Sequence, residues 1–126
     1  MDKPVISGVG SLACGCDKIT YWNVTVAALF GQSVKATGQC PNGGAVTCSD
    51  LIDCPHNRFC NRIVVAGGGQ CAGGAGQGTC WGLPPSCNDT DPKRYRECGM
   101  LGSCDTFCQR ILNEKPFYQD GTCPNP

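Results

Sequence analysis

Apolar and polar side chains alternate over residues 18–30, which is the pattern of a strand with one buried face. One face would carry Trp22, Val24, Val26, Ala28 and Phe30, and the more polar face would carry Tyr21, Asn23, Thr25 and Ala27. Successive side chains of a strand point to opposite faces, so this alternation predicts a strand. Gly31 interrupts the pattern, and residues 33–37 are predicted to return as a second strand.

A hexapeptide occurs twice in the chain. Residues 59–64 and 107–112 share four of six residues at an offset of 48. Five cysteines around the first copy match five around the second at offsets between 47 and 52: Cys40, Cys48, Cys54, Cys60 and Cys71 against Cys87, Cys98, Cys104, Cys108 and Cys123. Self-similarity at nearly one period indicates two copies of one cysteine-framed unit. We therefore predict two similar modules, residues 1–75 and residues 76–126.

The two copies of the hexapeptide differ in local preference. The β-branched run Ile63-Val64-Val65 favours a strand in the first copy, whereas residues 108–115 contain better helix formers. Residues 66–78 hold seven glycines. Ordering so much glycine costs conformational entropy, so this segment is predicted to be a hinge between modules, or else one long loop within a single domain. Residues 88–97 are the most charged segment and are predicted to be a solvated loop.

Composition places the chain among small cross-linked or metal-held proteins. Large aliphatic residues and phenylalanine together make up less than a fifth of its 126 residues, too few for a comfortable hydrophobic core. Thirteen cysteines compensate for this shortage. The fold class expected is therefore small, cysteine-rich and mainly β. A formal net charge of zero argues against general attraction to nucleic acid or to an acidic membrane surface.

Signals for cellular location are sparse. Residues 1–4 are not followed by the apolar core of a signal peptide. The protein is therefore either intracellular, or Met1 begins a mature secreted chain, and we favour the second interpretation. Glycosylation sequons at Asn23 and Asn88 fit passage through a secretory pathway. The sequon at Asn23 falls on the polar face of the expected strand, where a glycan would have room.

The cysteines leave two chemistries open. Disulfides suit the composition and the sequons. Zinc thiolate sites of four cysteines, or of three with a histidine, would also hold a unit this small. Redox and iron–sulfur sites are disfavoured because the chain contains no Cys-x-x-Cys. The odd cysteine total and the lone His56, two residues after Cys54, favour metal.

A catalytic constellation is not recognisable in the sequence. His56 is the only histidine, and nothing near it suggests a partner nucleophile. The glycine clusters are not followed by the lysine or helix start of a phosphate-binding loop. The chain is therefore predicted not to be an enzyme.

The chain resembles the small cysteine-rich secreted effectors of plant-pathogenic fungi. The short length, the cysteine share and the duplicated Phe-Cys-x-Arg-Ile frame carry this resemblance. It is most similar to avirulence effectors of rust fungi built from two zinc-binding modules. The resemblance implies a monomer that is secreted by the pathogen, enters the host cytoplasm and is recognised there by a nucleotide-binding leucine-rich-repeat receptor. An extracellular disulfide-framed toxin, inhibitor or apoplastic effector is the alternative function.

The resemblance also implies structural zinc, because thiols in a reducing cytosol survive as metal ligands. Ligands of a duplicated unit should themselves be duplicated. The expected ligands are two quartets, Cys48, Cys54, Cys60 and Cys71 in the first module and Cys98, Cys104, Cys108 and Cys123 in the second. Less regular sites would draw on Cys14, Cys16, Cys40, His56, Cys80 and Cys87. The alternative is that each quartet forms two disulfides and binds no metal.

Overall fold

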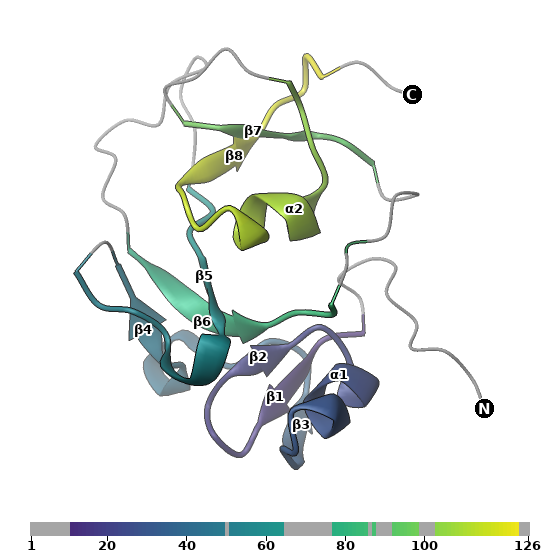
Figure 1. Cartoon of the computed structure of the whole chain (residues 1–126), viewed down its shortest axis with the longest axis vertical. Helices are drawn as coiled ribbons and strands as arrows, with labels where there is room; N and C mark the ends of the chain where they lie inside the picture. Colours follow the sequence, from purple (N-terminus) through teal and green to yellow (C-terminus); the bar gives the residue numbers. More distant parts are fainter. Residues whose placement is uncertain are drawn as a thin grey trace.

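The protein is small and mainly β, as the sequence predicts. The computed structural model describes residues 11–49, 51–64, 77–85, 87, 92–98 and 103–123. Its strands and helices are β1 (Ala13–Gly15), β2 (Thr20–Tyr21), α1 (Val24–Leu29), β3 (Val34–Thr37), β4 (Thr47–Cys48), β5 (Phe59–Asn61), β6 (Gly78–Gly82), β7 (Tyr95–Glu97), α2 (Phe107–Leu112) and β8 (Phe117–Gln119), with 3₁₀ turns η1 (Asn42–Gly44) and η2 (Pro55–Asn57) (Figure 1). Nearly all of the glycine segment, with Cys71 and the sequon at Asn88, lies outside the described residues.

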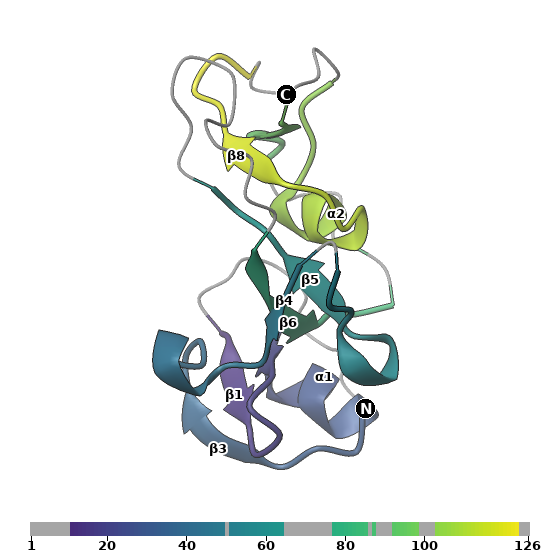
Figure 2. The same ribbon diagram turned by 90° about the vertical axis from the view of Figure 1, so that its left-hand side faces the viewer.

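Strand β6 is the centre of the larger sheet. The strand order is β3-β1-β2-β6-β4, and β5 also pairs with β6. The pairing of β2 with β6 is parallel, whereas β4 and β5 run antiparallel to β6. Strands β7 and β8 form a separate two-stranded sheet, and α2 lies between that sheet and the larger one (Figures 1 and 2). The predicted return strand over residues 33–37 is confirmed as β3.

The strand predicted over residues 18–30 is wrong for most of its length, because α1 occupies Val24–Leu29. Asn23 begins the helix: its side-chain oxygen accepts a hydrogen bond from the Val26 amide at 2.8 Å. Gly31 ends it with φ 72°, a conformation that glycine adopts without steric cost, and its amide donates to the Ala28 carbonyl. These two caps favour the helix more strongly than the alternating side chains favour a strand. The buried helical residues are the neighbours Val26 and Ala27, which a strand would place on opposite faces.

The capping role of Asn23 also determines how accessible this sequon is to a glycan. This residue is only 5 % exposed because its side chain is turned into the helix start. The expectation that Asn23 lies on an open polar face is therefore wrong. A glycan on the folded chain would displace the cap.

The repeated hexapeptide has a different conformation in each copy. The first three residues of the first copy form strand β5, which ends before the β-branched run that predicted a strand, and the second copy forms helix α2. The residue before the second copy explains the difference, since Thr106 caps the helix by accepting from the Gln109 amide at 3.1 Å. Arg58 precedes the first copy and has no side-chain oxygen for this purpose.

The surroundings of the two phenylalanines also differ. Phe107 packs against Trp22, Trp81, Tyr95 and Phe117, with ring centroids between 5.2 and 6.0 Å apart. Phe59 lies opposite Trp81 in the β5–β6 pairing and faces a surface hollow. The structure therefore does not show the duplicated unit.

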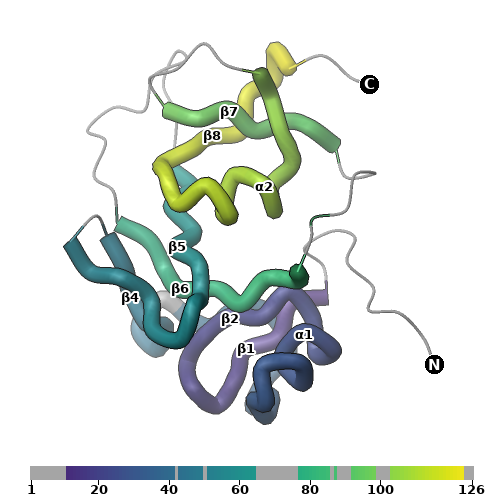
Figure 3. The backbone as a smooth tube through the Cα atoms, in the orientation of Figure 1, coloured from purple at the N-terminus to yellow at the C-terminus, as the bar shows by residue number. Residues whose placement is uncertain are grey.

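One apolar core joins the two halves of the chain. Buried Trp22, directly after β2, and Trp81 of β6 belong to the same core cluster as Ile111 of α2 and Phe117 of β8. The chain segment that continues from β5 also runs toward β8 (Figure 3), where Ile63 bridges to Phe117. Strand β6 lies beyond residue 75 in sequence yet pairs with β2, β4 and β5. The module boundary at residues 75 and 76 remains a prediction.

The charged segment over residues 88–97 is not entirely a solvated loop. Its last three residues form β7, and they are only partly exposed. Arg96 of this strand donates to Asp120 at 2.7 Å, and this ion pair holds the Arg96 side chain against the loop after β8.

Neither of the helices in the described residues is long and apolar enough to cross a membrane.

Candidate functional site

Cystines hold the described part of the chain at five places. They join Cys14 to Cys40, Cys48 to Cys60, Cys54 to Cys80, Cys87 to Cys108, and Cys104 to Cys123. Their Cα–Cα distances, 4.8 to 5.9 Å, lie within the range that a disulfide spans without backbone movement. Cys98 is also disulfide-bonded. Among the described cysteines only Cys16 is free, and it is exposed.

Two of these cystines lie side by side around β6. Cys60 of β5 and Cys80 of β6 are cross-strand neighbours, but Cys60 is bonded to Cys48 of β4 and Cys80 to Cys54. The Sγ atoms of Cys48, Cys54 and Cys80 all lie within 4.8 Å of one another. Four sulfur atoms are therefore gathered where three strands meet, and we call this group the sulfur cluster (Cys48, Cys54, Cys60 and Cys80).

A glycine makes this cluster sterically possible. Gly78 pairs with Cys48 in the β4–β6 register. A Cβ atom at Gly78 would overlap the carbonyl oxygen of Asn61 at the end of β5. The missing Cβ atom lets β5, which carries Cys60, approach β6 closely. The Arg62 side chain then covers the cluster by donating from Nε to the Cys60 Sγ at 3.3 Å.

The structure brings together three members of the first predicted zinc quartet. Cys48, Cys54 and Cys60 meet in the sulfur cluster, and their companion there is Cys80; Cys71 lies outside the described residues. The second quartet is divided, since Cys108 is bonded to Cys87 and Cys104 to Cys123. Disulfides fit the alternative without a metal, but the expectation of two disulfides within each quartet is wrong, because Cys54 bonds to Cys80 and Cys108 to Cys87. Zinc remains a prediction.

His56 does not join the sulfur cluster. It is exposed in η2 and has a left-handed backbone, with φ 52°. Asn57 follows with φ 62°. Two consecutive non-glycine residues in this region are uncommon, and such strain persists where the surroundings fix it. Here the turn directs Asn57 to the rim of a surface hollow.

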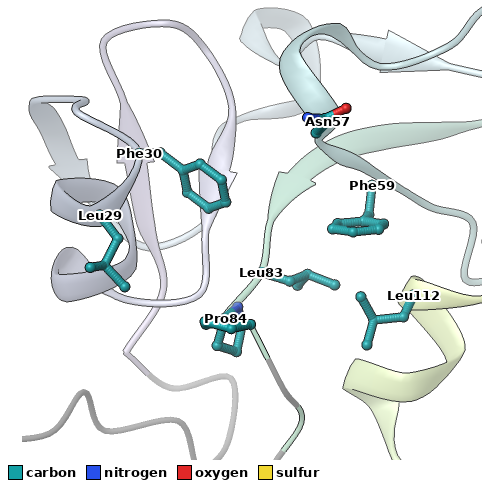
Figure 4. Close-up of a pocket in the computed structure, with 8 residues that line it drawn as sticks. Leu29, Phe30, Asn57, Phe59, Leu83, Pro84 and Leu112 are labelled. Atoms are coloured by element: carbon teal, nitrogen blue, oxygen red, sulfur yellow. The ribbon is translucent and has the colours of Figure 1, made fainter.

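The apolar hollow lies between α1, β5 and α2. Its volume is about 440 Å³, within the range of ligand pockets. Its lining consists of Leu29, Phe30, Asn57, Phe59, Leu83, Pro84, Pro85 and Leu112. Figure 4 shows Phe59 and Leu112 on one side and Leu29 and Phe30 on the other, with Leu83 and Pro84 between them and Asn57 at one end. The only polar lining residue is Asn57.

A buried arginine makes one wall of this hollow rigid. The Arg58 guanidinium lies 4.1 Å from the centre of the Phe30 ring, a cation–π arrangement. It also donates to the Tyr21 hydroxyl at 2.9 and 3.1 Å and to the His56 carbonyl at 2.6 Å. Burial and the hydrogen bond to Asp17 raise the pKa of Tyr21 to about 12, so this phenol is protonated at neutral pH and is a poor general base.

A second, polar hollow of about 480 Å³ adjoins the apolar one. The two share Asn57 and Phe59, and the lining of the polar hollow also includes Asp53, Cys54, Arg58 and Glu114. Asp53 and Glu114 are exposed, and neither side chain has a hydrogen bond or ion pair with another described residue. Arg58, in contrast, has its donors directed to Tyr21 and His56.

Comparison of the chain with protein-family models, with curated proteins and with solved structures finds no match. The site must therefore be interpreted from its own geometry.

Sequence reasoning missed both hollows and one cysteine of the cluster. The sequence places Cys80 only among the less regular sites, because Cys80 has no counterpart in the repeat. The hollow joins residues as far apart as Leu29 and Leu112, which no local pattern connects. For the apolar hollow, the sequence offers one signal: the helix formers after Phe107 predict that Leu112 lies on a helix.

Proposed function

We propose that this chain is a secreted protein, framed by disulfides, that acts by binding another protein outside the reducing cytosol. The observation that supports this proposal is the place of the cystines in the core. Of 17 buried apolar residues in the described part of the chain, six are half-cystines: Cys14, Cys40, Cys48, Cys60, Cys80 and Cys108. Reduction would therefore remove core packing as well as cross-links, and disulfides of this kind persist in oxidising compartments.

Binding rather than catalysis is part of the proposal. The one group of three or more metal-ligating or acidic side chains found among the described residues consists of half-cystines, which do not titrate. The only histidine is exposed in a 3₁₀ turn and does not belong to the sulfur cluster. The apolar hollow, with its single polar residue, suits recognition better than bond cleavage.

Thiol counting tests the disulfide frame. The native protein, purified without reductant, is treated with iodoacetamide and mapped by mass spectrometry. We expect Cys16 to be alkylated and the five cystine pairs to stay intact until a dithiol reductant is added, which should also abolish cooperative thermal unfolding. Alkylation of Cys48 or Cys80 in the native, unreduced protein would contradict the proposal.

A second function is favoured by the sulfur cluster. The protein would be a fungal avirulence effector that enters the plant cytoplasm, binds structural zinc there and is recognised by a nucleotide-binding leucine-rich-repeat receptor. A thiol reductant of the glutathione class would convert the two adjacent cystines into four thiols and become oxidised to its own disulfide. The four thiols would release four protons and bind one zinc ion tetrahedrally.

Metal analysis separates the two functions. The protein is refolded with zinc in the presence of a thiol reductant, and bound metal is measured by mass spectrometry. The cytoplasmic function predicts about one equivalent that Cys80→Ser removes, while Cys104→Ser leaves that equivalent in place. An unfolded, metal-free chain under these conditions supports the extracellular function instead.

A further inference from the structure

We propose that the two adjoining hollows form one docking site for a segment of a partner protein, in which a large apolar side chain is followed by a lysine or arginine. The inference rests on the proposed protein-binding function and specifies the surface that carries it. The apolar hollow would take the apolar side chain, and the polar hollow would take the cation.

The apolar hollow has the construction of an anchor pocket. Leu83 and Pro84, both almost completely buried, form a fixed base. The Phe30 wall is held by the Arg58 guanidinium, so it does not need to reorganise when a ligand enters. Leu29 at the rim is 61 % exposed, and covering it would remove apolar surface from water. Protein interfaces concentrate their binding energy where one anchor side chain fills such a pocket.

The charge of the neighbouring hollow selects the second side chain. Asp53 and Glu114 present two carboxylates to solvent, against one guanidinium whose hydrogen bonds are made inside the protein. A cation placed there finds two acceptors without competing for existing partners. Because Asn57 and Phe59 line both hollows, the two side chains of the bound segment must be close in sequence.

Short peptides test this site directly. N-acetyl-Trp-Lys-amide and N-acetyl-Trp-Glu-amide are titrated into ¹⁵N-labelled protein, and amide chemical shifts are followed by NMR. We expect shifts centred on Leu29, Phe59 and Leu112, and binding of the lysine peptide about two- to fivefold tighter than that of the glutamate peptide, as exposed charge pairs allow.

Matched variants separate the contribution of the apolar hollow to binding from that of the polar hollow. Leu29→Gln should weaken both peptides, whereas Val24→Gln, on the same helix and 56 % exposed, should not. Glu114→Gln should remove most of the preference for lysine, whereas Glu97→Gln, which makes the same charge change outside the hollows, should leave it intact. Unchanged thermal midpoints confirm that the variants are folded.

Several results would contradict the proposed docking site. Equal affinities for the two peptides would remove the role of the acidic hollow. Shifts elsewhere, or absence of shifts at the solubility limit of the peptides, would remove the site itself. Binding of N-acetyl-tryptophan amide as tightly as the lysine peptide would show a pocket for a small apolar molecule. None of these results affects the cystine mapping, so failure of this site is distinguishable from failure of the proposed function.

Discussion

Cys60 and Cys80 face each other across β5 and β6, and each is bonded to a cysteine from another segment rather than to the other. The two resulting cystines place the sulfur atoms of Cys48, Cys54 and Cys80 within 4.8 Å of one another. Strand pairing alone therefore does not determine the disulfide connectivity here, and the short distances allow exchange between the two cystines with little movement.

Substitution of Cys60 by serine should cause disulfide exchange. The released Cys48 thiolate would attack the Cys54–Cys80 cystine, forming a bond to one sulfur and expelling the other as a thiolate. We expect peptide mapping without reduction to find Cys48 linked to Cys54 or to Cys80 in part of the sample.

Two control variants accompany this experiment. The double variant Cys48→Ser, Cys60→Ser has no attacking thiol and should keep the Cys54–Cys80 bond. Cys104→Ser releases Cys123, which belongs to no sulfur group in the described part of the chain, so Cys54–Cys80 should persist there as well. A single Cys60→Ser variant that retains only Cys54–Cys80 would show that the cluster is too rigid to exchange.

Gly78→Ala should destabilise the larger sheet. The added Cβ would overlap the Asn61 carbonyl, which belongs to the backbone and cannot rotate away. Overpacking of this kind costs about 1–3 kcal/mol of unfolding free energy, measurable by urea denaturation. Gly43→Ala is the matched control, because a Cβ at Gly43 meets nothing within 4 Å. Equal stability of the two variants would mean that β5 and β6 are not packed as closely as described.

Thr106→Ala should weaken the start of α2. The Thr106 hydroxyl accepts from the Gln109 amide, and loss of such a cap typically costs about 1 kcal/mol. Thr106→Ser keeps the hydroxyl and should retain most of the stability in the same denaturation experiment. If both variants lose the same amount, packing of the Thr106 methyl group rather than the cap determines stability here.

The stability of the fold should fall at high pH through Tyr21. Its pKa is raised from 10.0 to about 12, because burial and the hydrogen bond to Asp17 disfavour the phenolate. The folded state then holds its proton more tightly than the unfolded state. The resulting stabilisation is fully present below pH 10 and is lost as the pH rises toward 12. Titration of tyrosinate absorbance should show a component near pH 12.

Tyr21→Phe identifies that component. The variant should lack it, and its stability should change less between pH 10 and pH 12. It should also be less stable at neutral pH, since Arg58 loses a buried hydrogen-bond acceptor. A component near pH 12 that survives the substitution would show that it does not come from Tyr21.

Local patterns in the sequence determined several elements. The return strand β3 follows from residue preferences that hold without distant contacts. The helix α1 was also encoded locally, by the cap at Asn23 and the glycine at position 31, but the alternating side chains between them indicated a strand. Caps decided the outcome because they satisfy backbone groups that would otherwise be unpaired at the helix ends.

Only the tertiary structure decided which cysteines meet and where a partner can bind. Cys80 joins the sulfur cluster because β6 lies between β4 and β5, an arrangement that depends on pairings between segments distant in sequence. The apolar hollow likewise combines Leu29, Phe59 and Leu112 from three elements. Residue preferences act over a few neighbours along the chain, whereas bond partners and cavities depend on distances in space, which the packing of the single core sets.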